Sequence, residues 1–161
     1  MSNSSLNLKI IPNIPDIDEG DNISDILISV LEQSSIILKE HDVLCIAHKI
    51  FSKAEGCIIK LTEITPSKEA AELGKTLNKD PRKIEVVLQE SKKIIRSFKR
   101  ADQNEGTLIC QHKLGFICAN AGVDESNLAE NETVITVPKN PDLSIKVLRD
   151  NLAHHFNLRN L

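Results

Sequence analysis

Polar and acidic side chains gather between residues 120 and 127, directly after a short apolar run. They provide an anionic oxygen, a hydroxyl and two amides, from Asp124, Ser126, Asn120 and Asn127. Gly122 lies among them and permits backbone conformations that other residues avoid. Carboxylate and amide oxygens are ligands that Mg²⁺ and Mn²⁺ prefer, so this segment is a candidate loop for a metal ion or a phosphate.

Histidines are the second group of side chains that could do chemistry. His112 lies shortly before the loop and could act as a general base, although a histidine with a structural role in a hairpin is the more common case. His154 and His155 are adjacent in the sequence. A helical metal pair needs a spacing of four residues, so we assign no catalytic role to these two.

A basic run between Lys92 and Arg100 contains five lysine and arginine residues. Such a run could bind phosphate, but charge runs are more often solvated surface. We therefore expect the end of a helix and a loop here.

Composition excludes several classes of protein. The net charge of the 161 residues is −3, and Trp and Tyr are absent, so we expect no nucleic-acid partner. No apolar stretch approaches the roughly 20 residues of a membrane helix, and the N-terminus does not resemble a signal peptide, so we expect a cytoplasmic protein with no membrane partner. The cysteine spacings match neither a zinc ribbon nor a redox pair, and we expect structural thiols at Cys45, Cys57, Cys110 and Cys118.

The elements that must position the loop follow from the hydrophobic pattern and the caps. We expect a hairpin of residues 107–110 and 114–118, whose second strand leads into the loop. Further strands are expected at 6–11, 43–47, 57–61 and 134–137. About four helices are expected, beginning near Asn22, Ser67, Asp80 and Asn140. The pattern indicates an α+β (mixed α/β) fold in a single domain, with more helix than strand.

Several short motifs occur together in a recognisable order. They are Ser52–Gly56, Asp80-Pro81, Gly115–Asp124, Ser126-Asn127 and Pro138–Asp142. In order and spacing they resemble the coenzyme F420:L-glutamate ligase (F420-0:gamma-glutamyl ligase) family, from about Leu8 to Arg149. The Asp-Thr-x-Gly-Arg type segment that completes the family's metal site does not occur in this chain. The resemblance therefore assigns residues 1–161 to the amino-terminal part of such a domain.

The resemblance implies an enzyme that adds L-glutamate by amide bonds to the coenzyme precursor F420-0, with GTP as co-substrate and Mg or Mn as the metal. It implies an acyl phosphate intermediate, formed when the substrate carboxylate attacks the γ-phosphate of GTP. It also implies a homodimer, or a second polypeptide that completes the site. No single catalytic residue is assigned.

The resemblance also implies which residues bind. Asp124 corresponds to a metal ligand, and Asn127 to a position that contacts the nucleotide. Lys53 is expected to bind phosphate through its compact ammonium charge. His48 and Lys49 match another nucleotide contact. An N-terminal nucleotide-binding segment corresponds to Ile14, Pro15, Asp16 and Ile17, although the local Pro-Asn-Ile-Pro replaces the Gly-containing version that is commoner in the family.

A non-catalytic function is the alternative. The chain could retain the first part of the fold as a binding or assembly module, with the reaction lost or supplied by a partner. Large apolar faces would then need to be covered by another polypeptide.

Overall fold

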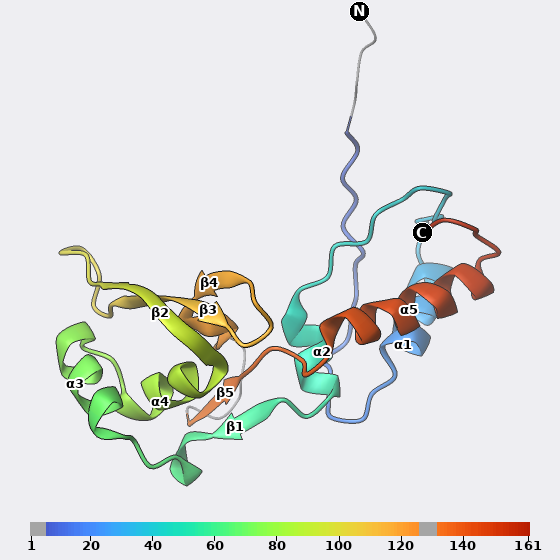
Figure 1. Ribbon diagram of the computed structural model, residues 1–161. Coiled ribbons are helices and arrows are strands. Elements are labelled where there is room, and N and C mark those ends of the chain that lie inside the picture. Colours follow the sequence, from blue (N-terminus) through green and yellow to red (C-terminus); the bar gives the residue numbers. More distant parts are fainter. Residues whose placement is uncertain (1–5, 126–131) are drawn as a thin grey trace, which may run out of the picture. The chain divides into compact units, whose positions relative to one another are not determined.

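The computed structural model describes residues 6–125 and 132–161, and Figure 1 shows its elements. The expected α+β class is confirmed: the described residues form five α-helices, five short strands and two 3-10 turns. Close contacts group the chain into two compact units. The first combines the residues before Cys57 with Pro138–Leu161, and the second is Cys57–Val137.

The first unit is helical. Its helices are α1 (Ile23–Gln33), α2 (His48–Ala54) and α5 (Pro141–His155). Asn22 and Asn140 cap α1 and α5 as expected, because their side chains accept main-chain N–H groups of the first turn. The three helices share one apolar core, whose buried members are Ile17, Ile23, Leu27, Leu31, Leu38, Phe51, Leu148 and Leu152.

Two strands expected in the first unit do not form. Residues 6–11 and 43–47 contain no strand, and α2 is a helix beyond the four that were expected. The apolar alternation at the N-terminus is real, but its side chains are more than four-fifths exposed at Leu6, Leu8 and Ile10. A strand needs a neighbour to satisfy its main chain, and these residues pair with no strand among those that the structure describes.

The second unit contains all the strands of the described chain. β1 (Ile58–Lys60) pairs antiparallel with β5 (Thr133–Ile135). β2 (Ser91–Phe98), β3 (Thr107–His112) and β4 (Ile117–Ala119) form an antiparallel sheet in the order β2-β3-β4. The expected hairpin is thus confirmed as β3 and β4, and a 3-10 turn, Asn120–Gly122, follows it directly.

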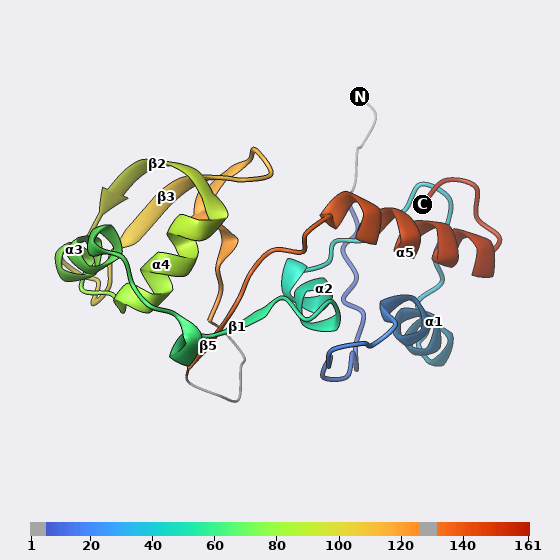
Figure 2. The same cartoon turned by 60° about the horizontal axis from the view of Figure 1, so that its bottom comes forward.

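Two helices pack on this sheet. α3 (Lys68–Leu77) begins at the cap Ser67, and α4 (Pro81–Glu90) begins at the cap Asp80, both as expected. Figure 2 shows both helices on the same side of the sheet. The buried side chains between helices and sheet are Ala70, Leu77, Ile84, Val87, Leu108, Cys110 and Ala121. A smaller cluster of Leu61, Val86 and Val134 joins α4 to β5 and to a second 3-10 turn, Leu61–Glu63.

The interpretation of the basic run as a helix end and a loop is wrong. α4 ends at Glu90, where the Ser91 hydroxyl donates to the Val87 carbonyl at 2.6 Å, and the backbone then becomes extended. The following residues form β2, in which Ile94 lies opposite the buried Cys110 of β3. A β-branched residue facing the core, together with pairing to β3, outweighs the charged neighbours.

The cysteines differ in their surroundings. Cys110 is fully buried, as expected of a structural thiol, whereas Cys45 is exposed. Within the ranges 6–125 and 132–161, no helix has the length and apolar character needed to cross a membrane.

Candidate functional site

The turn between β3 and β4 is organised around His112. The main-chain N–H of His112 donates to the Phe116 carbonyl at 2.8 Å, and the N–H of Gly115 donates back to the His112 carbonyl at 2.8 Å. The imidazole closes the same turn, because its Nδ1 accepts the N–H of Leu114 at 3.0 Å and its ring stacks on Phe116 with a centroid distance of 4.6 Å.

The chemistry of His112 follows from this geometry. Because Nδ1 accepts a hydrogen bond, the proton of the neutral ring is assigned to Nε2, which lies 3.5 Å from a carboxylate oxygen of Glu90. Burial lowers the pKa of His112, and the nearby charge of Glu90 opposes that shift. The side chain is almost fully buried. These contacts match a structural histidine of the hairpin and not a general base open to a ligand.

The turn after β4 has an unusual backbone. Asn120, Ala121 and Gly122 have φ angles of 48°, 49° and 73°, all in the left-handed region. The Asn120 side chain accepts the main-chain N–H of Leu108 at 3.2 Å, which fixes the turn to β3. Ala121 is fully buried, and a Cβ on Gly122 would lie 2.6 Å from a methyl group of Val137. Packing therefore holds a conformation that the chain would otherwise avoid.

Asp124 is held immediately after this turn. Its N–H donates to the Ile135 carbonyl at 2.9 Å, and its own carbonyl accepts the N–H of Ile135 at 2.8 Å. Ile135 belongs to β5 and is fully buried, so the backbone at Asp124 is attached to the core of the second unit. The residue itself is half-buried. A carboxylate on such a support matches the hard oxygen donor that Mg²⁺ or Mn²⁺ requires.

The ligand set around Asp124 is not complete within the described chain. Among residues 6–125 and 132–161, no three histidine, cysteine or acidic side chains gather as a metal site. Asn127, expected to contact the nucleotide, lies outside the described residues.

The other residues predicted to bind nucleotide belong to the first unit. His48, Lys49 and Lys53 all lie on α2, and the strand expected just before them, at 43–47, does not form. His48 contacts the fully buried Ser52 hydroxyl through Nδ1 at 3.2 Å. Lys53 is half-buried in the last turn of the helix.

The predicted N-terminal nucleotide segment precedes α1. The Ile17 side chain is buried in the helical core, and Ile14 packs against the same core. Pro15 and Asp16, between them, are exposed. Any ligand contact of this segment would thus involve the exposed pair or the main chain.

Two hollows in the first unit are formed by residues that the structure describes, from Leu6 onward. One, of about 560 Å³, is formed by the N-terminal ends of α1 and α5 and the end of α2. Phe51, Ala54, Glu55, Lys139 and Ser144 are among its lining residues, and Ala54 directly follows Lys53 in the sequence. The Ser144 hydroxyl donates to the Glu55 carboxylate at its rim.

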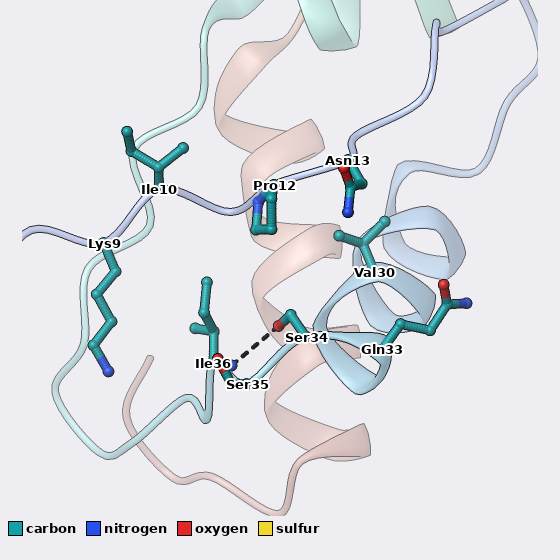
Figure 3. A pocket seen from close by; sticks show the side chains of 9 residues that line it. All are labelled: Lys9, Ile10, Pro12, Asn13, Val30, Gln33, Ser34, Ser35 and Ile36. Atoms are coloured by element: carbon teal, nitrogen blue, oxygen red, sulfur yellow. Dashed lines mark hydrogen bonds between the residues drawn. The ribbon is translucent and has the colours of Figure 1, made fainter.

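The second hollow has a volume of about 470 Å³ and lies between extended residues near the N-terminus and the end of α1. Figure 3 shows Lys9 and Asn13 on one side and Gln33 and Ser34 on the other. Both volumes fall in the size range of small-molecule sites. This second hollow was not predicted from the sequence, because its lining comes from a segment expected to be a strand, from the end of α1 and from the residues that follow it.

Comparison with known proteins gives a consistent result. The family model described as F420-0:Gamma-glutamyl ligase matches residues 12–160. The chain is 39% identical over 148 residues to a coenzyme F420:L-glutamate ligase of Methanopyrus kandleri, covering 92% of this chain and 54% of that protein. A protein of the same name from Methanothermobacter thermautotrophicus is 39% identical over 140 residues, or 86% of this chain and 53% of that protein.

A third relative, the coenzyme F420:L-glutamate ligase of Methanocaldococcus jannaschii, is 41% identical over 112 residues, covering 70% of this chain and 42% of that protein. The chain thus spans about half the length of the curated relatives that it matches. With a family match over nearly all of its residues, the chain belongs to the F420-0:gamma-glutamyl ligase family.

Proposed function

We propose that this chain provides the part of a GTP- and metal-dependent ligase that binds nucleotide and metal, and that the ligase joins L-glutamate to F420-0 through an amide bond. The family match over residues 12–160 carries this proposal. The two main-chain hydrogen bonds that attach Asp124 to β5 support it, because a metal ligand needs a rigid mount.

The reaction proceeds in two steps. The acceptor carboxylate of F420-0 attacks the γ-phosphate of GTP, which forms an acyl phosphate and releases GDP. The amine of glutamate then attacks the acyl carbon, the new amide bond forms, and inorganic phosphate leaves with the electron pair of the broken C–O bond and takes up the proton that the amine loses. A bound Mg²⁺ or Mn²⁺ supplies stabilisation of the negative charge on the phosphate oxygens.

The proposal gives a role to each residue that the resemblance indicated. Asp124 would hold the metal through its carboxylate, together with phosphate oxygens of the nucleotide. Lys53 would contact phosphate, and His48 and Lys49 would contact the nucleotide from the same helix. The exposed Pro15 and Asp16, with the main chain of the neighbouring isoleucines, would add the N-terminal contact.

The matched segment supplies only part of the site in this proposal. The relatives are about twice as long as that segment, and we propose that residues corresponding to their other half, or a second copy in a homodimer, supply the remaining contacts. A binding or assembly module remains the second candidate. The largely exposed apolar side chains near the N-terminus favour it, since an assembly surface must present such groups.

Thermal unfolding with ligands tests the proposal. GTP and Mn²⁺ together should raise the melting temperature of the chain, because a ligand at 100 times its dissociation constant stabilises the folded state by about 2.7 kcal/mol. Asp124→Asn should remove the part of the shift that depends on Mn²⁺. Asp102→Asn, an exposed acidic residue in the turn before β3, is the matched control and should leave the shift unchanged.

The same titration separates the two candidates. A shift that appears only after the second half of the Methanopyrus kandleri relative is added supports a ligase whose site needs the residues of that half. Absence of a shift under both conditions would contradict nucleotide binding and favour the module.

A further inference from the structure

Strand β2 carries a dense basic surface at the edge of its sheet. It pairs with β3 on one side only, as the sheet order β2-β3-β4 requires. The strand and the two residues that follow it contain the five exposed basic side chains of this segment, here called the basic edge: Lys92, Lys93, Arg96, Lys99 and Arg100.

The charges of the basic edge are not neutralised within the described chain. None of the five side chains forms an ion pair with a residue in the ranges 6–125 and 132–161. A shortage of acidic residues is not the reason, because the chain has 23 acidic and 20 basic residues. The neighbouring strand β3, Thr107–His112, contributes no acidic side chain. The basic edge therefore presents positive charge outward on a protein whose net charge is negative.

Both arginines of the basic edge contact the same aromatic ring. The guanidinium carbon of Arg96 lies 5.3 Å from the centroid of the Phe98 ring, and that of Arg100 lies 5.9 Å from it. Both distances are within the range of a cation–π interaction. Stacking against a ring leaves the N–H groups at the guanidinium rim available, and these groups pair with carboxylates in a bidentate manner.

Protection of an edge strand is the simplest alternative. Lysines on an edge prevent pairing with other chains, and Lys92 and Lys93 satisfy that need. Edge protection does not require two arginines arranged on one phenyl ring. Nucleic acid is disfavoured as well, because Phe98 is the sole aromatic side chain of the segment and both arginines lie within cation–π distance of its ring, where a base would have to stack.

We propose that the basic edge binds an extended chain of γ-linked glutamyl groups. The inference rests on the proposed function, since glutamyl groups are what a glutamate ligase adds to its acceptor. The eight residues of β2 span about 26 Å and Lys99 and Arg100 follow them directly, so the cations of the basic edge can meet several carboxylates in succession. Arg96 and Arg100 form the bidentate carboxylate contacts, and the lysines contribute longer-range attraction.

Fluorescence anisotropy of the full chain with dye-labelled tri-γ-L-glutamate tests the proposal, with no nucleotide or metal present. The expected result is saturable binding at low salt that weakens as salt is added. Arg96→Glu combined with Arg100→Glu should weaken binding by about tenfold or more. The variant with Arg96→Gln and Arg100→Gln should weaken peptide binding less. It replaces the charge-reversal variant in the test if charge reversal prevents folding.

A control variant with the same change in charge makes the test specific. Lys68→Glu with Lys75→Glu alters two exposed lysines on α3 and should leave the affinity nearly unchanged. Equal losses in both variants, or no anisotropy change with the unaltered chain, would overturn the proposal. Binding of the peptide with its carboxylates converted to amides, or equal affinity for a DNA oligonucleotide of the same charge, would also overturn it.

This measurement is independent of the thermal test with GTP and Mn²⁺. A thermal shift with GTP but no glutamyl binding would overturn the proposed role of the basic edge and leave the ligase proposal intact. Glutamyl binding without a GTP shift would retain the basic edge as a binding surface and contradict the nucleotide site.

Discussion

Gly122 has the backbone angle and the close neighbour that make a glycine irreplaceable. Its φ is +73°, and an added Cβ would lie 2.6 Å from Val137. Gly122→Ala should therefore lower the free energy of unfolding by roughly 2 to 4 kcal/mol, from backbone strain together with steric conflict. Urea denaturation measures this loss.

Gly115 is the matched control for that substitution. Its φ is +103°, but no atom lies within 4 Å of the position of an added Cβ. Gly115→Ala should lower the free energy of unfolding through backbone strain alone, by about 1 kcal/mol or somewhat more. Equal losses in the two variants would show that packing against Val137 does not hold the turn before Asp124.

His112 gives a prediction for the dependence of stability on pH. Its pKa is lowered in the folded state by burial, below the ordinary value of 6.5. In the unfolded chain the ring binds a proton more readily, so its contribution to stability is complete above about pH 6.5 and is lost as the pH falls toward the folded pKa. Urea midpoints between pH 7.5 and 5.5 should fall with decreasing pH, and His112→Gln should flatten that dependence.

Glu90 provides the control for the histidine. Its charge raises the pKa of His112 and opposes the effect of burial. Glu90→Gln should therefore lower the pKa of His112 in the folded state further. The pH range over which stability is lost should then extend to more acidic values. A titration of the His112 ring by NMR measures the shift, and a rise of the pKa in this variant would contradict the contact seen at 3.5 Å.

At the scale of elements, the cap of α4 carries a further prediction. The Asp80 side chain accepts the N–H of Arg82 at 2.8 Å and also pairs with its guanidinium at 2.8 Å. Asp80→Ala should lower the free energy of unfolding by about 1 to 2 kcal/mol, because it removes a helix cap. The Arg82 guanidinium lowers the pKa of Asp80, so this contribution is present above the ordinary carboxylate pKa and lost as the pH falls. Denaturation at neutral and acidic pH checks both points.

Caps also explain which elements could be predicted from the sequence. Ser67, Asp80 and Asn140 each precede a helix in the structure, because a side-chain acceptor followed by a proline or a helix former is a local signal. The hairpin of β3 and β4 was equally predictable, since its apolar runs flank a short polar turn.

Strand pairing was harder to predict because it depends on distant residues. Val43 is 84% exposed although its neighbours form an apolar, β-rich run, since the described chain offers them no partner strand. The basic run forms β2 for the opposite reason, because β3 is available beside it. The position of Asp124 in a polar loop after a short apolar run could be predicted from the sequence. The main-chain hydrogen bonds between Asp124 and Ile135 could not.

At the scale of the whole molecule, the extended N-terminal segment should take part in association and not in the stability of the chain alone. Leu8 and Ile10 are 87% and 88% exposed, so replacing both by lysine removes almost no buried apolar surface. Leu8→Lys with Ile10→Lys should leave the urea midpoint within about 0.5 kcal/mol of the unaltered chain. The buried Leu27 of α1 is the contrast, and Leu27→Ala should cost about 2 to 5 kcal/mol.

The mass of the protein in solution then tests what the exposed side chains do. If they are covered by a second copy or by a second polypeptide, as proposed, the Leu8→Lys and Ile10→Lys variant should form less complex than the unaltered chain in sedimentation experiments. A control that replaces the exposed Asn7 by lysine adds charge beside the same segment but keeps its apolar side chains, and should retain more of the complex. A complex that survives the double substitution undiminished would place the contact elsewhere, because two lysines cannot be buried at an apolar interface without a large desolvation cost.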